Sequence, residues 1–316
     1  MDDGRAGDDE RAALFALLDE RPALGDDPQG KTSWSAIASE VAQRGSASAL
    51  WEEVHPLTLD GMHDADGALA SARAQLTMWR ESDFHLVTVL DSEYPLALRE
   101  IHQCPPVLFV KGKLLADDVG VSVVGSRVST RRGHEIASRI AKGLAGRGIS
   151  VISGLAAGID TAAHEATIAF GGRAVGVLGT GISLVYPEDN RELHDQVAAA
   201  GALVSQFMPD APPDKHTFPM RNATMSGLGR ASVIVEAGEY SGTRTLARLA
   251  VEHGRPVILT DEVVNSTRWA RQLRNRPGVY VAGSTADVMG IVEQVVRDVD
   301  NGARAAVLTA RDADPG

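Results

Sequence analysis

The sequence predicts an α/β fold: a Rossmann-like, doubly wound and mostly parallel sheet, preceded by a small N-terminal helical domain. Two segments carry this prediction, 121–127 and 151–164, because each reads as an apolar β-branched run, a glycine turn and then a helical pattern. Strand and helix patterns continue to alternate as far as residue 282. Parallel strands need a crossover between them, so this alternation is typical of a parallel sheet covered by helices on both faces.

The N-terminal part of the chain reads as helical. Residues 1–10 are expected to form a disordered acidic tail, and residues 11–83 the small helical domain. Apolar residues recur at helical spacing over Arg11–Glu20, Ser33–Gln43 and Ala68–Arg80, which predicts a helix in each range.

Residues 84–298 are expected to form the Rossmann-like core, and residues 299–316 a flexible tail. Strands are expected where short apolar runs end in glycine or polar residues, at 107–110, 121–125, 149–153, 174–178, 202–207, 232–236, 256–260 and 279–282. Helices are expected where the spacing becomes helical, at 132–147, 160–170, 190–200, 243–254, 265–274 and 285–298.

The composition is that of a globular protein from a reducing compartment. The 316 residues suffice for one large domain and a smaller one, and 44% of them are hydrophobic but only 4% aromatic, so the core is mainly aliphatic. Cys104 is the only cysteine, which excludes an intrachain disulfide and a cysteine-built metal cluster. The acidic N-terminus has no apolar signal region and no apolar run reaches membrane-spanning length, so we expect a cytoplasmic protein without a membrane partner.

The net charge of -11 argues against a protein that binds nucleic acid over its whole surface. The acidic residues gather at the two ends, where residues 1–30 carry a net -6 and residues 285–316 a net -3. Residues 205–284 instead hold ten basic and seven acidic residues, a net +3. A local basic face is compatible with this distribution, and phosphate binding needs only such a face.

Glycine turns end three of the predicted strands. At each turn a helix N-terminus can direct free N–H groups at an anion, while glycine lets a phosphate approach the backbone. The residues concerned are Gly125, Ser126 and Arg127 in the first turn, Gly154 and Gly158 in the second, and Gly179, Thr180 and Gly181 in the third. Arg127 can form a fork on phosphate or can simply face water at a tight turn. The three turns together favour a phosphate-bearing ligand at the carboxyl edge of the sheet.

Asp160 and His164 lie one helical turn apart after the second glycine turn. They can be interpreted as an acid–base pair, or as an N-cap hydrogen-bonded to a structural histidine. We favour the structural interpretation, because no serine or cysteine nucleophile and no third orienting group accompanies them. We therefore expect no catalytic residue, no metal, no cofactor and no enzymatic activity.

The segment 215–222 places two cations, a ring and an amide within eight residues. A base could stack on Phe218 while Lys215 and Arg221 contact phosphates and Asn222 lies beside them, an arrangement typical of single-stranded nucleic-acid binding. Taken alone, the segment reads equally well as a surface loop with an anchoring phenylalanine.

A further group, Ser241, Gly242, Thr243 and Arg244, follows the fifth core strand and opens a helix. It can bind another anion or merely cap that helix. A basic run lies beyond it, consisting of Arg268, Arg271, Arg274 and Arg276. Such a run is typical of a solvated helix face.

Together these segments resemble the DNA-processing protein A family (DprA, also called Smf). The matching segments are 124–127, 153–164, 178–181, 186–191 and 218–222, within a resemblance that covers roughly residues 84–260. The chain is divergent, because Ala223 stands where the family usually has a second arginine, and 260–265 replaces a Pro-Gly turn.

The resemblance implies a protein that binds single-stranded DNA, protects it and passes it to the RecA recombinase, typically as a homodimer. It places the family's phosphate-binding arginine on Arg127, and its lysine and phenylalanine on Lys215 and Phe218. We therefore predict a DNA-binding protein of recombination and natural transformation. The alternative is a nucleotide-binding sensor or a base-releasing nucleotide hydrolase, because Glu236 with Gly242 and Thr243 resembles the hydrolases' glycine-threonine-acid loop.

Overall fold

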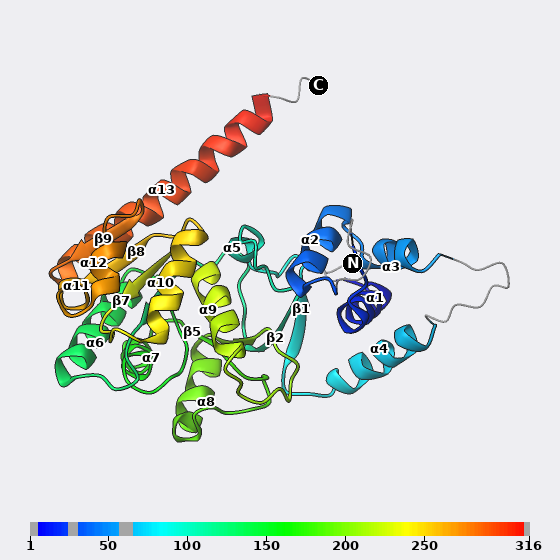
Figure 1. Ribbon diagram of the computed structural model, residues 1–316, viewed down its shortest axis with the longest axis horizontal. Helices are drawn as coiled ribbons and strands as arrows, with labels where there is room; N and C mark the ends of the chain where they lie inside the picture. Colours follow the sequence, from blue (N-terminus) through cyan, green and yellow to red (C-terminus); the bar gives the residue numbers. More distant parts are fainter. Residues whose placement is uncertain (1–5, 25–30, 57–65, 313–316) are drawn as a thin grey trace.

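A computed structural model of the chain describes residues 6–24, 31–56 and 66–312 (Figure 1). These residues form one nine-stranded sheet in the order β1-β2-β6-β5-β4-β3-β7-β8-β9. The strands are β1 (His85–Thr88), β2 (Val107–Gly112), β3 (Gly120–Val124), β4 (Ser150–Ser153), β5 (Ala174–Val177), β6 (Ala202–Ser205), β7 (Ala231–Ile234), β8 (Val257–Thr260) and β9 (Val279–Ala282). Neighbours from β6 to β9 in this order are parallel, whereas β1 and β2 add antiparallel strands at one edge. The predicted mostly parallel, Rossmann-like sheet is confirmed.

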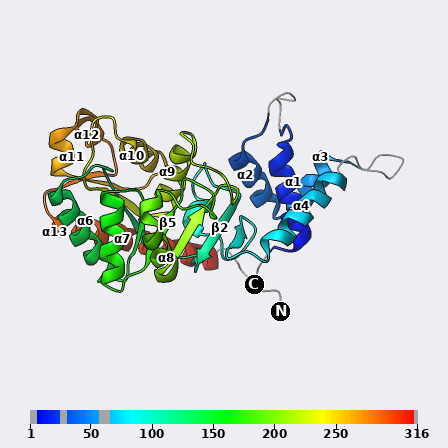
Figure 2. The ribbon, with the colours of Figure 1, turned by 90° about the horizontal axis from the view of Figure 1, so that it is seen from below.

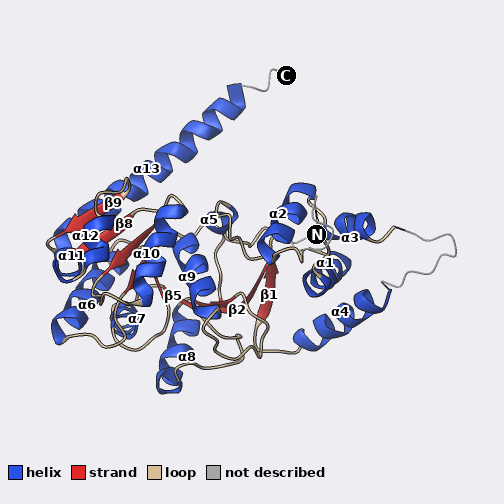
Figure 3. Cartoon of the chain, in the orientation of Figure 1, coloured by secondary structure: helices blue, strands red, loops and turns tan. Residues whose placement is uncertain are grey.

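The connecting helices cover both faces of the sheet, as Figures 2 and 3 show. They are α5 (Leu96–Arg99), α6 (Arg131–Ala145), α7 (Ile159–Ala169), α8 (Arg191–Ala200), α9 (Thr217–Leu228), α10 (Gly242–Glu252), α11 (Asp261–Ser266), α12 (Arg268–Leu273) and α13 (Thr285–Asp312). Helices α6, α7 and α13 bury Val121 and Val123 of β3 under one face. On the other face α9 packs against α10, and their Met225 and Leu246 cover Val124. No helix within the described residues is both long and apolar enough to cross a membrane.

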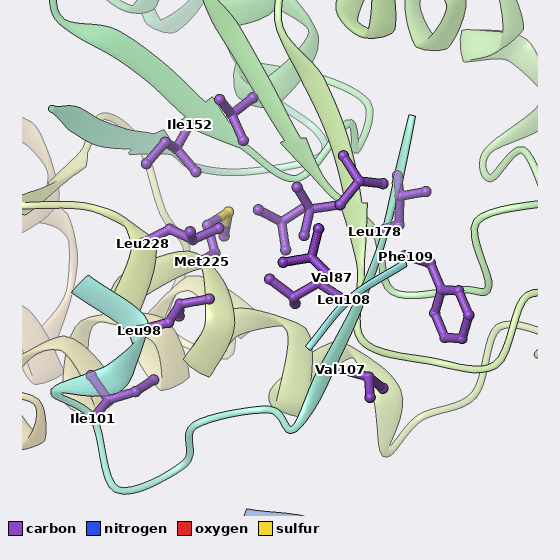
Figure 4. Close-up of a cluster of buried hydrophobic side chains, with 14 of the residues drawn as sticks. Val87, Leu98, Ile101, Val107, Leu108, Phe109, Ile152, Leu178, Met225 and Leu228 are labelled. Atoms are coloured by element: carbon purple, nitrogen blue, oxygen red, sulfur yellow. The ribbon is translucent and has the colours of Figure 1, made fainter. Parts of the chain in front are cut away.

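Helix α9 is held on the second face by an aliphatic cluster (Figure 4). Met225 and Leu228 of α9 lie beside Leu98 and Ile101, which belong to α5 and the turn after it, and near Ile152 of β4. All five side chains are buried. This packing determines where the first turn of α9 lies, and that turn carries the aromatic and cationic residues of the candidate site.

The N-terminal helices pack on β1 and β2 at the antiparallel edge of the sheet. They are α1 (Asp8–Glu20), α2 (Trp34–Arg44), α3 (Ala47–Val54) and α4 (Asp66–Trp79). An aromatic cluster joins them to the sheet, because the ring of Trp79 lies 5.1 Å from both Phe15 and Phe109. Arg11 of α1 also forms an ion pair of 3.2 Å with the buried Asp91. The helical unit is thus packed on the core, and its boundary at residue 83 stays a prediction.

Two helices extend into segments expected to be unstructured. Helix α1 begins at Asp8, inside the expected acidic tail 1–10, because acidic side chains in a first turn interact favourably with its free N–H groups. Helix α13 continues to Asp312, through most of the expected tail 299–316, where several alanines favour a helix despite Gly302. The ends of the two expected tails, residues 1–5 and 313–316, lie outside the described residues.

Two other expectations are corrected by local capping. The expected helix 265–274 is divided into α11 and α12, because Thr260 and Thr267 each accept a backbone N–H of the following turn. The segment 215–222 is not a loop throughout, since α9 begins at its third residue. Pro219 fits there because the first turn of a helix needs no intrahelical N–H donor.

Candidate functional site

A cavity of about 640 Å³ opens at the carboxyl ends of β3 and β7. These strands are neighbours in the sheet, but β3 is followed by β4 on one side and β7 by β8 on the other. The loops that leave them diverge, which creates the crevice where ligands bind in open α/β sheets. Predicted site residues that line it are Gly125, Ser126, Arg127, Phe218, Arg221, Asn222, Ser241, Gly242 and Thr243.

A second cavity of about 110 Å³ adjoins the first. It is lined by Gly154 and Gly179 of the other two glycine turns and by Tyr186 and Pro187. Phe218 lines both cavities. The three glycine turns therefore meet around one ring, although they are separate in the sequence.

Phe218 lies within a group of cations and one other ring. The guanidinium carbon of Arg127 lies 5.1 Å from its ring centroid, and that of Arg221 lies 5.9 Å away. The ring of Tyr186 is 5.8 Å distant at an interplanar angle of 49°. Arg127 is exposed and Phe218 is half-buried, so a ligand in the larger cavity can reach an aromatic surface and a solvated cation together.

Arg221 differs from Arg127, because it is buried and bound to the protein. Its Nη1 donates to the carbonyl oxygens of Gly154 at 2.7 Å and Val177 at 2.9 Å. The backbone N–H of Gly154 in turn donates to Oδ2 of the buried Asp160 at 3.2 Å. Burial lowers the pKa of Arg221 and raises the pKa of Asp160, and the charge of each opposes that effect on the other. Arg221 thus holds the second glycine turn in place, and its contact with phosphate stays a prediction.

The glycines of these turns make room for side chains of the protein itself. A Cβ atom at Gly154 would collide with the guanidinium of Arg221, and one at Gly179 would lie 2.7 Å from Cδ1 of Phe218. Gly158 has a φ of +84° and would meet the carbonyl oxygen of Ser126. At Gly154 and Gly179 the absent side chain thus makes room for Arg221 and Phe218, and the approach of a phosphate to these turns stays a prediction.

The N-terminus of α6, an expected anion site, is occupied by a carboxylate of the chain. The backbone N–H of Thr130 lies 3.1 Å from both carboxylate oxygens of Glu236, and Thr130 Oγ1 donates to Oε2 at 2.8 Å. A Cβ atom at Gly133 would collide with the same carboxylate. Glu236 lines neither cavity, so it is not placed as the acid of a hydrolase.

The N-terminus of α10 instead borders the larger cavity. Ser241 caps this helix, and its Oγ accepts the N–H of Thr243 at 3.2 Å. Gly242 has no other group within 4 Å of the place where a Cβ would lie. The group proposed as a secondary anion site is therefore the helix start that a ligand in the cavity can approach.

Five predicted residues line neither cavity, namely Gly158, Thr180, Gly181, Lys215 and Arg244. Thr180 is buried and its carbonyl oxygen accepts from Ser205 Oγ at 2.6 Å, while the N–H of Gly181 donates to the carbonyl of Ala211 at 2.8 Å. Lys215 and Arg244 are exposed, one before α9 and the other in the first turn of α10. Neither lines a cavity described above.

His164 is a buried, structural histidine as favoured, but Asp160 neither caps α7 nor pairs with His164. The N-cap of α7 is Gly158, and Asp160 lies inside the helix with its carboxylate bound to the N–H of Gly154. His164 is fully buried and makes no hydrogen bond to Asp160 within the described residues. Burial lowers the pKa of His164 to about 4, so its ring is neutral at pH 7.

Two aromatic residues of the site were not identified from the sequence. Tyr186 contacts Phe218, and Tyr240 lines the larger cavity with 92% of its surface exposed. The signal for Tyr240 is a single aromatic residue between Gly238 and Gly242, directly after a buried strand.

The chain matches the family model of DNA recombination-mediator protein A over residues 85–283. It is 36% identical to DNA processing protein DprA of Bacillus subtilis over 185 residues, which are 58% of this chain and 62% of that protein. It is 40% identical to Protein Smf of Synechocystis sp. over 173 residues, or 53% of this chain and 44% of that protein. The chain thus spans about half to three fifths of the length of these curated relatives.

Solved structures show the same similarity. DNA processing protein A from Streptococcus pneumoniae has a TM-score of 0.68 and 27% identity, over 90% of this chain and 98% of that one. DNA processing protein A from Helicobacter pylori shares the fold, with a TM-score of 0.60 and 21% identity over 69% of this chain and 98% of that one. The resemblance predicted from the motifs is confirmed: the chain belongs to the DNA recombination-mediator protein A family.

Proposed function

We propose that this chain binds single-stranded DNA at the carboxyl edge of its sheet. The observation that carries the proposal is the half-buried ring of Phe218, which borders both cavities and has the exposed guanidinium of Arg127 5.1 Å from its centroid. A base can stack on the ring while Arg127 contacts the adjoining phosphate. In support, DNA processing protein A from Helicobacter pylori, which shares the fold, has a single-stranded DNA binding mode.

The remaining predicted residues extend this site in two directions. The start of α10, with Ser241, Gly242 and Thr243, borders the larger cavity, and its positive helix end can attract a second phosphate. Lys215 is exposed one turn before Phe218 and supplies a further cation at the rim.

We also propose that the chain acts by binding and not by catalysis. The two carboxylates that line the larger cavity are both engaged in the fold, since Asp160 accepts the N–H of Gly154 and Glu239 accepts the N–H of Arg268. Neither is free to act as a general base. Purified protein is expected to release no base from nucleotides and to cut no DNA.

We propose two protein partners, the RecA recombinase and a second copy of this chain. A recombination mediator hands its strand to a recombinase, so we propose transfer of the bound DNA to RecA in the cytoplasm.

We propose a homodimer as well. In support, β9 is an edge strand on which Tyr280 and Val281 are 42% and 45% exposed.

A salt titration tests the proposal. The affinity for fluorescein-labelled oligo-dT, measured by fluorescence anisotropy, is expected to fall linearly with salt on logarithmic axes, because bound cations are released. Mononucleotides are expected to bind weakly and to compete poorly. Tight mononucleotide binding together with no salt-dependent binding of oligo-dT would refute the proposal and support the nucleotide-sensor alternative.

A further inference from the structure

Tyr240 lies in the turn between β7 and α10, at the mouth of the cavity that Phe218 lines from another side. Its side chain is 92% exposed. A single exposed ring is ordinary on a protein surface, but a ring at the mouth of a cavity offers a flat face on which a ligand in that cavity can stack.

The exposure of Tyr240 is built into the fold, because the residues on both sides of it are held. The carboxylate of Glu239 accepts the backbone N–H of Arg268 at 2.7 Å. The indole N–H of the buried Trp269 donates to the carbonyl of Gly238 at 3.2 Å. The turn is thereby anchored to the start of α12, while the ring itself projects into solvent.

Helix α12 continues from this anchor with a row of cations. Arg268, Arg271 and Arg274 follow one another at three-residue spacing and are all exposed. Arg268 has its Nε 3.6 Å from Glu239, whereas Arg271 and Arg274 form no ion pair with any described residue. These two guanidiniums without an ion pair lie on and just after the helix whose start anchors the turn of Tyr240, so the same types of group, cations and a stacking surface, are present as at Phe218 and Arg127.

We propose that the single-stranded DNA surface leaves the cavity over Tyr240 and continues onto the arginines of α12. The inference rests on the proposed function and extends it. A base of the emerging strand stacks on Tyr240, and Arg271 and Arg274 contact the following phosphates. The occupant is a polyanion with flat bases, because this surface offers exposed cations and an exposed ring.

Two lengths of oligo-dT separate the cavity from its extension. An oligomer of about 4 nucleotides tests the cavity, and one of about 15 nucleotides reaches α12, both within the range of site sizes for such folds. Tyr240→Ala is expected to weaken binding of the longer oligomer about 5- to 150-fold, the loss of one stacked base. Binding of the shorter oligomer should change less than about twofold, and Tyr240→Phe should bind both as the unmodified protein does.

The cations are tested in the same way. The double variant Arg271→Ala/Arg274→Ala is expected to lower the salt slope by about two units for the longer oligomer alone. Matched controls are Phe170→Ala, an exposed ring at the C-terminal end of α7, and Arg139→Ala, an exposed arginine on α6. Neither control should alter binding.

The outcomes distinguish this inference from the proposed function. If the unmodified protein binds both oligomers but Tyr240→Ala and the arginine variant also bind the longer one normally, the extension is wrong and the proposed function stands. An equal loss for both oligomers would assign Tyr240 to the cavity and also refute the extension. A protein that binds neither oligomer would refute both. Because the Tyr240 ring is 92% exposed, its removal should leave the melting temperature unchanged.

Discussion

Replacing Phe218 with alanine tests whether this ring stacks a DNA base or only anchors α9. The structure predicts two losses. Binding should weaken by about 1–3 kcal/mol, the value of one stacked base, which is about 5- to 150-fold in Kd. Stability should fall by about 1–3 kcal/mol, because the variant loses the ring contact with Tyr186 at 5.8 Å, the cation contact with Arg127 at 5.1 Å and packing against Gly179. For a chain of this size, such a loss lowers the melting temperature by only a few degrees, on the scale of about 2–4 °C per kcal/mol.

Two further substitutions separate the losses. Phe218→Leu keeps apolar volume beside Gly179 but removes the flat ring, so it should bind as poorly as alanine while melting close to the unmodified protein. Phe218→Trp should largely keep binding. The assay is fluorescence anisotropy with labelled oligo-dT at about 25 °C, a temperature at which nearly all of each variant is folded. The salt slope of binding should stay unchanged, because these substitutions remove no phosphate contact. Normal affinity of folded Phe218→Ala and Phe218→Leu would refute the stacking role.

Four other expectations follow from the same contacts. Arg127→Ala should weaken oligo-dT binding by about 1.5–3 kcal/mol and hardly change the melting temperature, since the side chain is exposed and loses only its cation contact with Phe218; an unaltered Kd would contradict the assignment. Arg221→Met should destabilise the fold by about 1–3 kcal/mol in urea unfolding, because the carbonyl groups of Gly154 and Val177 lose their buried donor; a variant as stable as the parent would show that these two contacts are dispensable. Burial lowers the pKa of His164 to about 4, from about 6.5 in an unfolded chain. The contribution of the neutral His164 ring to the free energy of unfolding is therefore complete above about pH 6.5 and is lost as the pH falls towards 4. That loss is about 3 kcal/mol, and His164→Gln should flatten this part of the pH profile; an identical profile would refute the cause. Light scattering should give a mass near twice 33.4 kDa, and a monomer at tens of micromolar would contradict the homodimer.

The strands and the residue types of the site could be predicted from local sequence. Buried parallel strands are short apolar runs, and 121–124 and 174–177 stand out between glycine and polar residues. The glycine turns mark where those strands end, and Arg127 and Phe218 are an exposed cation and a ring in segments whose residue types suit DNA. These features depend on neighbours within a few positions, which a sequence displays directly.

Only the tertiary structure decided which partner each of these residues has. Glu236 reaches the start of α6 at Thr130, 106 residues earlier, and so fills an anion site that the local pattern left open. Arg221 reaches Gly154 across 67 residues, so it supports the second glycine turn, a role that its neighbours in the sequence do not indicate. Such pairs depend on the order of strands in the sheet, which places β7 beside β3. Hydrophobic periodicity shows which face of a single helix or strand is buried, so it carries no information about which strands are neighbours.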